Sequence, residues 1–163
     1  MDPKDLLDPC IPVKAIATQS RIFRDGKGLL LKYSRGGNPQ KVQAEAVMLT
    51  DLRDSGYVPK VYDVGPNYIL MEDLGESEKI TDLEKVIRHA LATLTALRKA
   101  SIFHNDLASE SNILYRDSAP YIIDFGRATR GKPLSGAYPD YFILIAILKT
   151  FLRQSLVTEH LVK

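Results

Sequence analysis

The sequence predicts an α+β fold in which a strand-rich half precedes a mainly helical half. Short apolar runs separated by turn residues fill roughly the first 75 residues, around a single helix. The second half contains two long apolar patterns with helical spacing. A length of 163 residues suits one domain, or one domain built of two small lobes.

In the first half, the strands are expected at residues 15–18, 21–24, 28–33, 61–64 and 68–71. Asp25-Gly26 is typical of a hairpin turn between the second and third strands. Gly65-Pro66 joins the last two strands.

The helix of this half begins at Asn38, which can cap it with Pro39 in the first position. Gly56 can end it. Four residues share one face of this helix, namely Val42, Glu45, Ala46 and Leu49.

In the second half, Thr81 and Glu84 have the spacing of a capping box, which predicts a helix start. An apolar stripe follows at helical spacing, formed by Leu83, Val86, Ile87, Ala90, Leu91, Leu94 and Leu97. Residues 113–115 and 121–123 are expected to be short strands around a turn at 116–118, and the last helix covers about 140–152.

Composition and charge exclude several classes of protein. The chain has 45% hydrophobic and 26% charged residues, which excludes disorder and coiled coil as the main structure. Cys10 is the single cysteine, so neither a disulfide framework nor a Cys-rich zinc site is expected. The net charge of +2 is too balanced to indicate a nucleic acid or an anionic membrane as a direct partner.

The apolar runs favour a cytoplasmic protein. Residues 1–10 contain no apolar stretch of the signal-peptide type. The longest apolar run, residues 141–148, is much shorter than the roughly 20 residues that a membrane span needs. With a lone cysteine, this pattern indicates a reducing compartment and no membrane association.

Two strings carry candidate chemistry: residues 104–114, His-Asn-Asp-Leu through Asn-Ile-Leu, and residues 121–126, Tyr-Ile-Ile-Asp-Phe-Gly. If their short strands pair as a hairpin, Asn112 and Asp124 meet at one end, with Asp106 just before them in the chain. Such oxygen ligands suit Mg²⁺ and leave one carboxylate free. This arrangement is typical of phosphoryl transfer, in which a metal holds phosphates and a carboxylate orients the attacking hydroxyl.

These strings resemble two motifs of the protein kinase-like superfamily. His104-x-Asp106-Leu107 with Asn112 is similar to the catalytic loop, and Asp124-Phe125-Gly126 to the metal-binding motif that follows it. The resemblance implies a single minimal bilobal kinase-like domain over residues 1–163. Its strand-rich N-lobe would cover about 1–73 and its truncated helical C-lobe about 77–163.

The resemblance also implies roles for individual residues. Asp106 would orient the acceptor hydroxyl and Lys32 would bind the phosphates of ATP, with Glu45 as the partner of Lys32. Asn112 and Asp124 would hold Mg²⁺, or Mn²⁺ in its place. Residues 68–73 resemble the strand and hinge that bind adenine, in which Met71, Glu72 and Asp73 would contact the nucleotide. Asp140 resembles the aspartate that braces the catalytic loop.

The sequence departs from the usual kinase pattern in three places. The expected first loop, residues 17–20, lacks a G-x-G-x-x-G motif, so backbone N–H groups and the hydroxyls of Thr18 and Ser20 would cover the phosphates. Five residues separate Asp106 from Asn112 where the motif has four, and a bulge within residues 108–111 would let Asn112 reach the metal. Only thirteen residues lie between Gly126 and Asp140. This compactness is similar to the RIO kinases and the small kinase subunit of the KEOPS complex.

The resemblance implies an ATP- and Mg²⁺-dependent kinase, with Ser or Thr of a protein as the acceptor. Two alternatives stay open: a small-molecule kinase, and a nucleotide-binding regulatory ATPase or scaffold within a complex. The apolar segment 141–148 predicts a buried helix. Few residues follow Leu152 to cover it, so we expect a protein partner or a second copy of the chain to bind along the helix at 140–152.

Overall fold

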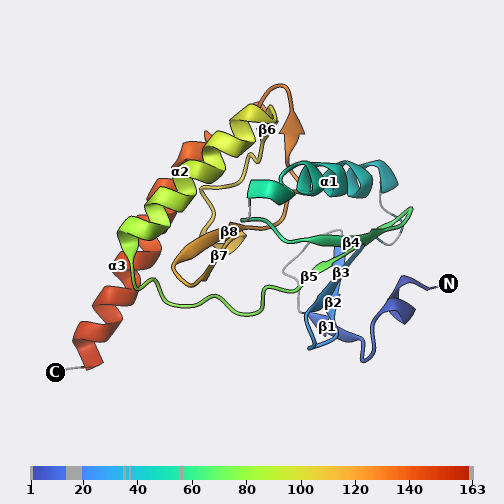
Figure 1. Cartoon of the computed structure of the whole chain (residues 1–163), viewed down its shortest axis with the longest axis horizontal. Helices are drawn as coiled ribbons and strands as arrows, with labels where there is room; N and C mark the ends of the chain where they lie inside the picture. Colours follow the sequence, from blue (N-terminus) through green and yellow to red (C-terminus); the bar gives the residue numbers. More distant parts are fainter. Residues whose placement is uncertain (1, 14–19, 35, 37, 56, 162–163) are drawn as a thin grey trace. The chain divides into compact units, whose positions relative to one another are not determined.

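The computed structural model describes residues 2–13, 20–34, 36, 38–55 and 57–161. Two compact units are present, the first formed by Met1–Arg53 with Pro59–Gly75 and the second by Asp54–Val58 with Glu76–Lys163. Strands dominate the first unit and helices the second (Figure 1), so the predicted α+β class is confirmed.

The first unit is built on a five-stranded antiparallel sheet. Along the sheet the strands follow the order β1 (Ile11–Val13), β2 (Ser20–Arg24), β3 (Leu29–Ser34), β5 (Tyr68–Glu72) and β4 (Val61–Val64). The helix α1 (Pro39–Asp51) packs against β4 and β5, and a 3₁₀ turn at Pro3–Leu6 lies near β3. The strand expected at residues 15–18 lies outside the described residues.

The predicted hairpin between β2 and β3 is confirmed. Arg24 pairs with Leu30, and the loop between them begins at Asp25. The Asp25 side chain accepts hydrogen bonds from the backbone N–H groups of Lys27 (2.7 Å) and Leu29 (2.9 Å). Burial is the largest single influence on the pKa of Asp25 and raises it, but the backbone bonds together outweigh burial and lower that pKa. The turn is therefore fixed by a side chain that replaces backbone partners.

The helix α1 begins as predicted. The Asn38 side chain accepts from the N–H of Gln40 at 3.0 Å, and Pro39 occupies the first helical position. Its predicted inward residues, Val42, Glu45, Ala46 and Leu49, are all buried. The helix ends at Asp51, earlier than expected, and a 3₁₀ turn at Arg53–Ser55 follows it.

The strand β3 has two different faces because successive side chains point to opposite sides of a sheet. Leu31 packs with Leu7 and Phe23 in an apolar cluster that Leu29 and Tyr33 border. Lys32 therefore points to the opposite face of the sheet. This alternation decides which residue of the strand can meet α1.

The second unit contains the helices α2 (Leu83–Lys99) and α3 (Ile143–Leu161), which pack against each other (Figure 1). Two small antiparallel sheets accompany them, one formed by β7 (Ile113–Arg116) with β8 (Ala119–Ile122) and one by β6 (Ile102–Phe103) with β9 (Thr129–Arg130). The sequence pattern predicts the first of these sheets but not the second, whose strands have two residues each.

The hairpin of β7 and β8 brings together the two chain segments that carry Asn112 and Asp124. Ile113 pairs with Ile122, and the tight turn is Asp117-Ser118. Both turn residues have φ near +54°, as the favoured two-residue hairpin turn requires. At the turn, β7 extends one residue further than predicted, to Arg116, and β8 begins two residues earlier, at Ala119. β8 ends at Ile122, one residue before the predicted end.

The capping box expected for α2 is wrong. Asp82 is the cap, and its carboxylate accepts from the N–H of Lys85 at 3.0 Å. Thr81 instead shares a hydrogen bond with the hydroxyl of Ser118 at 2.9 Å. Leu91, predicted in the apolar stripe, is 49% exposed, and Thr93 is buried in this region of the helix.

The last helix differs from its prediction in length and exposure. Residues 140–142 form a 3₁₀ turn, and α3 continues to Leu161 instead of ending near Leu152. Ile143, Ala146 and Ile147 are buried, whereas one face of α3 is exposed, consisting of Ile145, Leu148, Leu152 and Leu156. We call these four residues the outer α3 face. No helix in the described part of the chain is long and apolar enough to cross a membrane.

Candidate catalytic site

The candidate phosphate-binding lysine of the first unit is held by a carboxylate. Lys32 Nζ donates to Glu45 Oε2 at 2.8 Å and to Oε1 at 2.9 Å. The strand β3 points Lys32 toward the face that α1 covers, and the buried face of α1 carries Glu45. The two side chains are only 11% and 5% exposed.

This pair is a buried ion pair, so desolvation opposes it and each charge depends on the other. Removing one partner would leave an uncompensated charge in the interior. The ammonium group carries a compact positive charge that suits a phosphate oxygen. The pairing that the sequence predicts for Glu45 is therefore present, and it fixes the position of the Lys32 charge.

The other nucleotide-binding candidates of the first unit are placed by the sheet. Met71 is buried on β5, opposite Leu30. The Glu72 N–H donates to the Lys60 carbonyl, and the Asp73 N–H donates to the Gly28 carbonyl, both at 2.8 Å. The backbone N–H groups of both residues are therefore already bonded within the sheet, and the Glu72 side chain accepts from the Lys60 N–H at 3.3 Å.

Asp73 is further held in place by its side chain. Its carboxylate lies 3.2 Å from Arg24 Nε and accepts from the Gly75 N–H at 3.0 Å. Ser20 is the first residue of β2, and Thr18 lies outside the described residues.

In the second unit, Asp106 and Asn112 are in direct contact. Asn112 Nδ2 donates to the Asp106 carboxylate oxygen Oδ2 at 2.9 Å and to the Asp106 carbonyl at 3.0 Å. Neither bond uses the Asn112 oxygen Oδ1, which is the side-chain atom that can bind a cation. The amide is therefore oriented by Asp106.

The extra residue between them is absorbed by a change of backbone structure. The Ser109 N–H donates to the Asp106 carbonyl at 3.4 Å, and the Asn112 N–H donates to the Ser109 carbonyl at 3.2 Å. Residues Glu110–Asn112 form a 3₁₀ helix. Two tight turns in succession accommodate five intervening residues and still return Asn112 to Asp106.

The hairpin places Asp124 beside this loop. The Ile123 N–H donates to the Asn112 carbonyl at 3.0 Å, which extends the pairing of β7 with β8 by one step. Asp124 follows with φ +58°, in the left-handed region. Its Oδ1 accepts from the Gly126 N–H at 3.2 Å. Aspartate tolerates this backbone conformation better than most residues, because its short polar side chain can bond locally.

The second unit thus gathers two carboxylates and one amide oxygen. Hard oxygen donors of this kind suit Mg²⁺, which usually keeps several waters and takes few protein ligands. Asn112 and Asp124 carry side-chain oxygens that could serve as ligands of such a metal, and the carboxylate of Asp106 is held by the amide nitrogen of Asn112. Among the described residues, no group of three or more His, Cys, Asp or Glu side chains could hold a metal by itself.

Asp140 braces the backbone of the loop. Its Oδ2 accepts from the His104 N–H at 2.8 Å, and its Oδ1 accepts from the Asn105 N–H at 3.0 Å. Asp140 stands in the short turn before α3, so the helix and the loop are connected by one carboxylate. These are the contacts that the resemblance implies for this residue.

His104 has a structural position in the same loop. Its Nε2 donates to the Ile123 carbonyl at 2.9 Å, and its ring packs edge-on against Phe125. Burial lowers the pKa of His104, against smaller raising effects that include its bond to Ile123 and the charge of Asp140. The ring is fully buried, and this neutral imidazole connects the two motifs.

Sequence reasoning misses two polar residues of this loop. Asn105 has φ +70°, and its side chain donates to the carbonyls of Phe103 and Arg127 and to the Thr129 hydroxyl. An asparagine inside a motif of fixed spacing is a signal for such a left-handed position. The second missed residue is Glu110, which bonds to α3 and for which the sequence contains no local signal.

Comparison with known families gives one clear match. The model of the RIO domain matches residues 33–137, which is well over half of the chain.

Two curated relatives from archaea also match. Each is described as a "Probable bifunctional tRNA threonylcarbamoyladenosine biosynthesis protein". The one from Methanocorpusculum labreanum is 31% identical over 113 residues, and the one from Methanoculleus marisnigri is 28% identical over 113 residues. Each alignment covers 68% of this chain and 21% of the relative, so the chain spans about a fifth of the length of these relatives.

A solved structure shares the fold. It is the crystal structure of the Rio2 kinase–ADP/Mg²⁺–phosphoaspartate complex from Chaetomium thermophilum, with a TM-score of 0.63 and 20% sequence identity. The match covers 88% of this chain and 56% of the Rio2 chain.

Proposed function

Since the chain belongs to the RIO domain family, we propose that it binds ATP with Mg²⁺ and transfers the γ-phosphoryl group to a hydroxyl. A serine or threonine of a protein is the proposed acceptor. The observation that carries this proposal is the hydrogen bond from Asn112 Nδ2 to the Asp106 carboxylate at 2.9 Å. The Asn112 carbonyl also accepts from the N–H of Ile123, the residue directly before Asp124. Nucleotide and metal are also the ligands named for the Rio2 neighbour.

In this proposal each site residue has a separate task. Lys32, held by Glu45, binds phosphate oxygens of the nucleotide. Asp124 and the Asn112 oxygen hold Mg²⁺, which when bound neutralises charge on the phosphates. Asp106 accepts a hydrogen bond from the acceptor hydroxyl and takes its proton as the hydroxyl oxygen bonds to the γ-phosphorus, while the bond from that phosphorus to the bridging oxygen breaks and ADP leaves.

Asn112 has a second task in this scheme. Its Nδ2 donates to Asp106 Oδ2, which fixes one carboxylate oxygen and leaves the other for the acceptor. The bond also stabilises the ionised carboxylate, the form that can accept a proton.

The test uses Asp106→Asn, with Asp117→Asn as its matched control. Asp117 is an exposed residue of the β7–β8 turn in the same unit, with a left-handed backbone that asparagine tolerates. With radiolabelled ATP and Mg²⁺, we expect Asp106→Asn to lower turnover by at least ~10²-fold with little change in nucleotide affinity, because proton transfer acts at the chemical step. Asp117→Asn should keep full activity. A large loss of nucleotide affinity in Asp106→Asn would instead place Asp106 among the ligands of the nucleotide–metal complex.

A second candidate function is ATP hydrolysis in a regulatory role within a tRNA-modifying assembly. The two archaeal relatives favour this function, because both are described as probable tRNA threonylcarbamoyladenosine biosynthesis proteins. The same assay separates the two functions. Label on a protein supports the kinase, and release of inorganic phosphate without labelled protein supports the ATPase.

We also propose a protein partner on the outer α3 face. The C-terminal half of α3 extends beyond α2 (Figure 1), and the four aliphatic side chains of this face, Ile145, Leu148, Leu152 and Leu156, are exposed. In each archaeal relative, the segment aligned with this chain is 21% of the length, so about four-fifths of the relative lies outside it. We propose that a protein domain similar to this unaligned part binds the outer α3 face.

This partner is testable with the remainder of the Methanocorpusculum labreanum relative, expressed without its 113 aligned residues. Sedimentation of the two proteins should show a complex that Leu152→Glu abolishes and Asp117→Asn retains. Self-association of this chain alone, abolished by Leu152→Glu, would mean that a second copy occupies the face instead.

A further inference from the structure

Glu110 connects the catalytic loop of the second unit to α3. Its Oε1 accepts from the Thr150 hydroxyl at 2.7 Å and from Arg153 Nη2 at 2.8 Å, and its Oε2 accepts from Arg153 Nη1 at 3.1 Å. Glu110 is one of the five residues between Asp106 and Asn112, where the usual motif has four. The bond therefore belongs to the part of the loop that departs from the pattern.

This contact is stronger than an ordinary surface ion pair. The guanidinium group binds both carboxylate oxygens, a geometry that adds energy and fixes orientation. The hydroxyl of Thr150, a buried residue, gives the carboxylate a third bond. Arg153 and Arg88 are similarly exposed, at 60% and 66%, but the Glu110 side chain is only 28% exposed, whereas that of Glu84 on α2 is 88% exposed. The Arg153 and Thr150 bonds lower the pKa of Glu110, so the carboxylate stays ionised at neutral pH.

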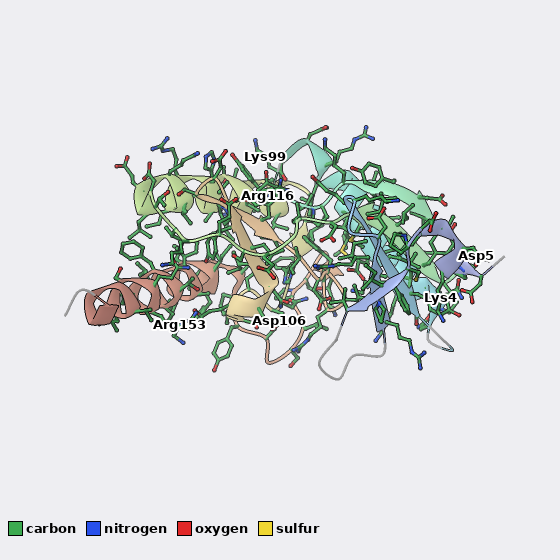
Figure 2. The ribbon with its side chains drawn as sticks, turned by 90° about the horizontal axis from the view of Figure 1, so that it is seen from below. Lys4, Asp5, Lys99, Asp106, Arg116 and Arg153 are labelled. Atoms are coloured by element: carbon green, nitrogen blue, oxygen red, sulfur yellow. The ribbon has the colours of Figure 1, made fainter. Side chains whose placement is uncertain are left out.

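Glu110 is joined directly to the backbone of Asn112. It is the first residue of the 3₁₀ helix Glu110–Asn112, and its carbonyl accepts from the Ile113 N–H. Asn112 in turn binds Asp106 through Nδ2. Only one turn of backbone separates the carboxylate that α3 holds from the amide that orients the Asp106 carboxylate. Figure 2 labels Asp106 on this loop and Arg153 on α3.

We propose that Glu110 is a positioning residue, which holds the lengthened loop on α3 so that Asn112 keeps its place beside Asp106. A loop with one more residue has more ways to close, and anchoring its middle removes that freedom. In a catalytic loop, small displacements have large effects on rate, because the reacting groups must be aligned. The inference rests on the proposed function for its effect on catalysis, but the anchor itself is a property of the loop.

The first test is Glu110→Gln, with Glu84→Gln as the matched control. Both changes remove one carboxylate charge from an ion pair with arginine in the same unit. For Glu110→Gln we expect turnover to fall roughly 10-fold and the Mg²⁺ concentration for half-maximal rate to rise roughly 5-fold, with the KM for ATP within about twofold. Glu84→Gln should change none of these. An unchanged Mg²⁺ dependence and turnover in Glu110→Gln would overturn the proposal.

A double-mutant cycle tests whether Arg153 acts through Glu110. If the two residues act as one anchor, Glu110→Gln combined with Arg153→Gln should lower turnover no further than either single change. Losses that multiply would show that the residues act separately, which contradicts the proposed anchor.

Hydrogen exchange provides a readout that does not require activity. The amides of Asn112 and Ile113 are bonded within this turn, to the carbonyls of Ser109 and Glu110. We expect both to exchange roughly 10-fold faster in Glu110→Gln and at the wild-type rate in Glu84→Gln. Equal acceleration along α2 would indicate a general loss of stability and would overturn a local role. If these amides respond while the wild-type chain transfers no phosphate, the proposed function fails and the anchor stands.

Discussion

The two units hold their candidate site residues by different physical means. In the first unit, Lys32 lies on the regular strand β3 and Glu45 on the regular helix α1, and the two buried side chains form an ion pair. In the second unit, the residues stand on irregular backbone with left-handed φ at Asn105 and Asp124. Bonds from the Asp140, His104 and Asn105 side chains to the backbone hold this loop in shape.

The difference shows two ways of fixing a charged group. A buried ion pair on regular elements depends on both charges, so its loss should appear in stability. A polar loop fixed by many separate bonds should lose less stability for each change, while its function depends on alignment. Substitutions in the first unit should therefore mainly lower the free energy of unfolding, and substitutions in the second unit should mainly lower turnover.

The largest expected effect is that of Asp124→Asn on turnover. If Asp124 holds the metal, loss of its charge should lower phosphoryl transfer by at least ~10³-fold, because electrostatic stabilisation in the site is lost. The unfolding free energy should change little, since asparagine tolerates the left-handed backbone at φ +58°. Steady-state assays and chemical denaturation measure the two effects. Activity within tenfold of wild type would remove Asp124 from the metal site.

In the first unit, substitution of Glu45 should lower the free energy of unfolding, which Asp124→Asn should leave nearly unchanged. Glu45→Ala leaves the Lys32 ammonium buried without its carboxylate, which should lower the free energy of unfolding by about 3 kcal/mol. The control is Glu84→Ala, whose partner Arg88 is 66% exposed and whose loss should cost at most ~0.5 kcal/mol. Equal losses in the two variants would mean that the buried pair is no more than a surface contact.

The brace of the candidate catalytic loop should have an intermediate effect. In Asp140→Asn one carboxylate oxygen becomes an NH₂ group, which cannot accept from the N–H of His104 or Asn105. One backbone donor is left unsatisfied, at a cost of about 1–3 kcal/mol in unfolding free energy. Hydrogen exchange of these two amides should accelerate more than exchange in β7. Unchanged exchange at both positions would show that other groups hold the loop.

The sequence predicts the regular parts of this molecule well because their signals are local. The cap at Asn38, the buried face of α1 and the hairpins around Asp25 and Asp117 follow from residue spacing within a few positions. The capping error at Thr81 has the same origin: Thr81 and Asp82 are both good caps, and the Ser118 hydroxyl, far along the chain, engages Thr81. Local pattern alone cannot choose between two adjacent caps.

The candidate site divides in the same way. The hairpin that brings Asn112 toward Asp124 follows from two short apolar runs, and the Lys32–Glu45 pair follows from the cost of an unpaired buried charge. The bond of Glu110 to Arg153 joins residues 43 positions apart, and neither has a local signal. The small sheet of β6 and β9 joins strands too short to show a period. Contacts of this kind depend on the tertiary fold.

The smallest expected effect belongs to Tyr115 on β7. Tyr115 is 1% exposed, and its hydroxyl lies beside Thr150 without a hydrogen bond of ordinary geometry to any described residue. Burial raises its pKa to about 12. A buried hydroxyl without a well-formed hydrogen bond opposes folding, so Tyr115→Phe should leave the free energy of unfolding unchanged or raise it by up to ~1 kcal/mol. The matched control is Tyr57→Phe in the same unit, which removes a hydroxyl bonded to His89 and should cost about 1 kcal/mol. A loss in Tyr115→Phe as large as that of the control would mean that the Tyr115 hydroxyl belongs to the polar cluster of Glu110 and Thr150. The polar contacts that hold the candidate catalytic loop would then extend from α3 into β7.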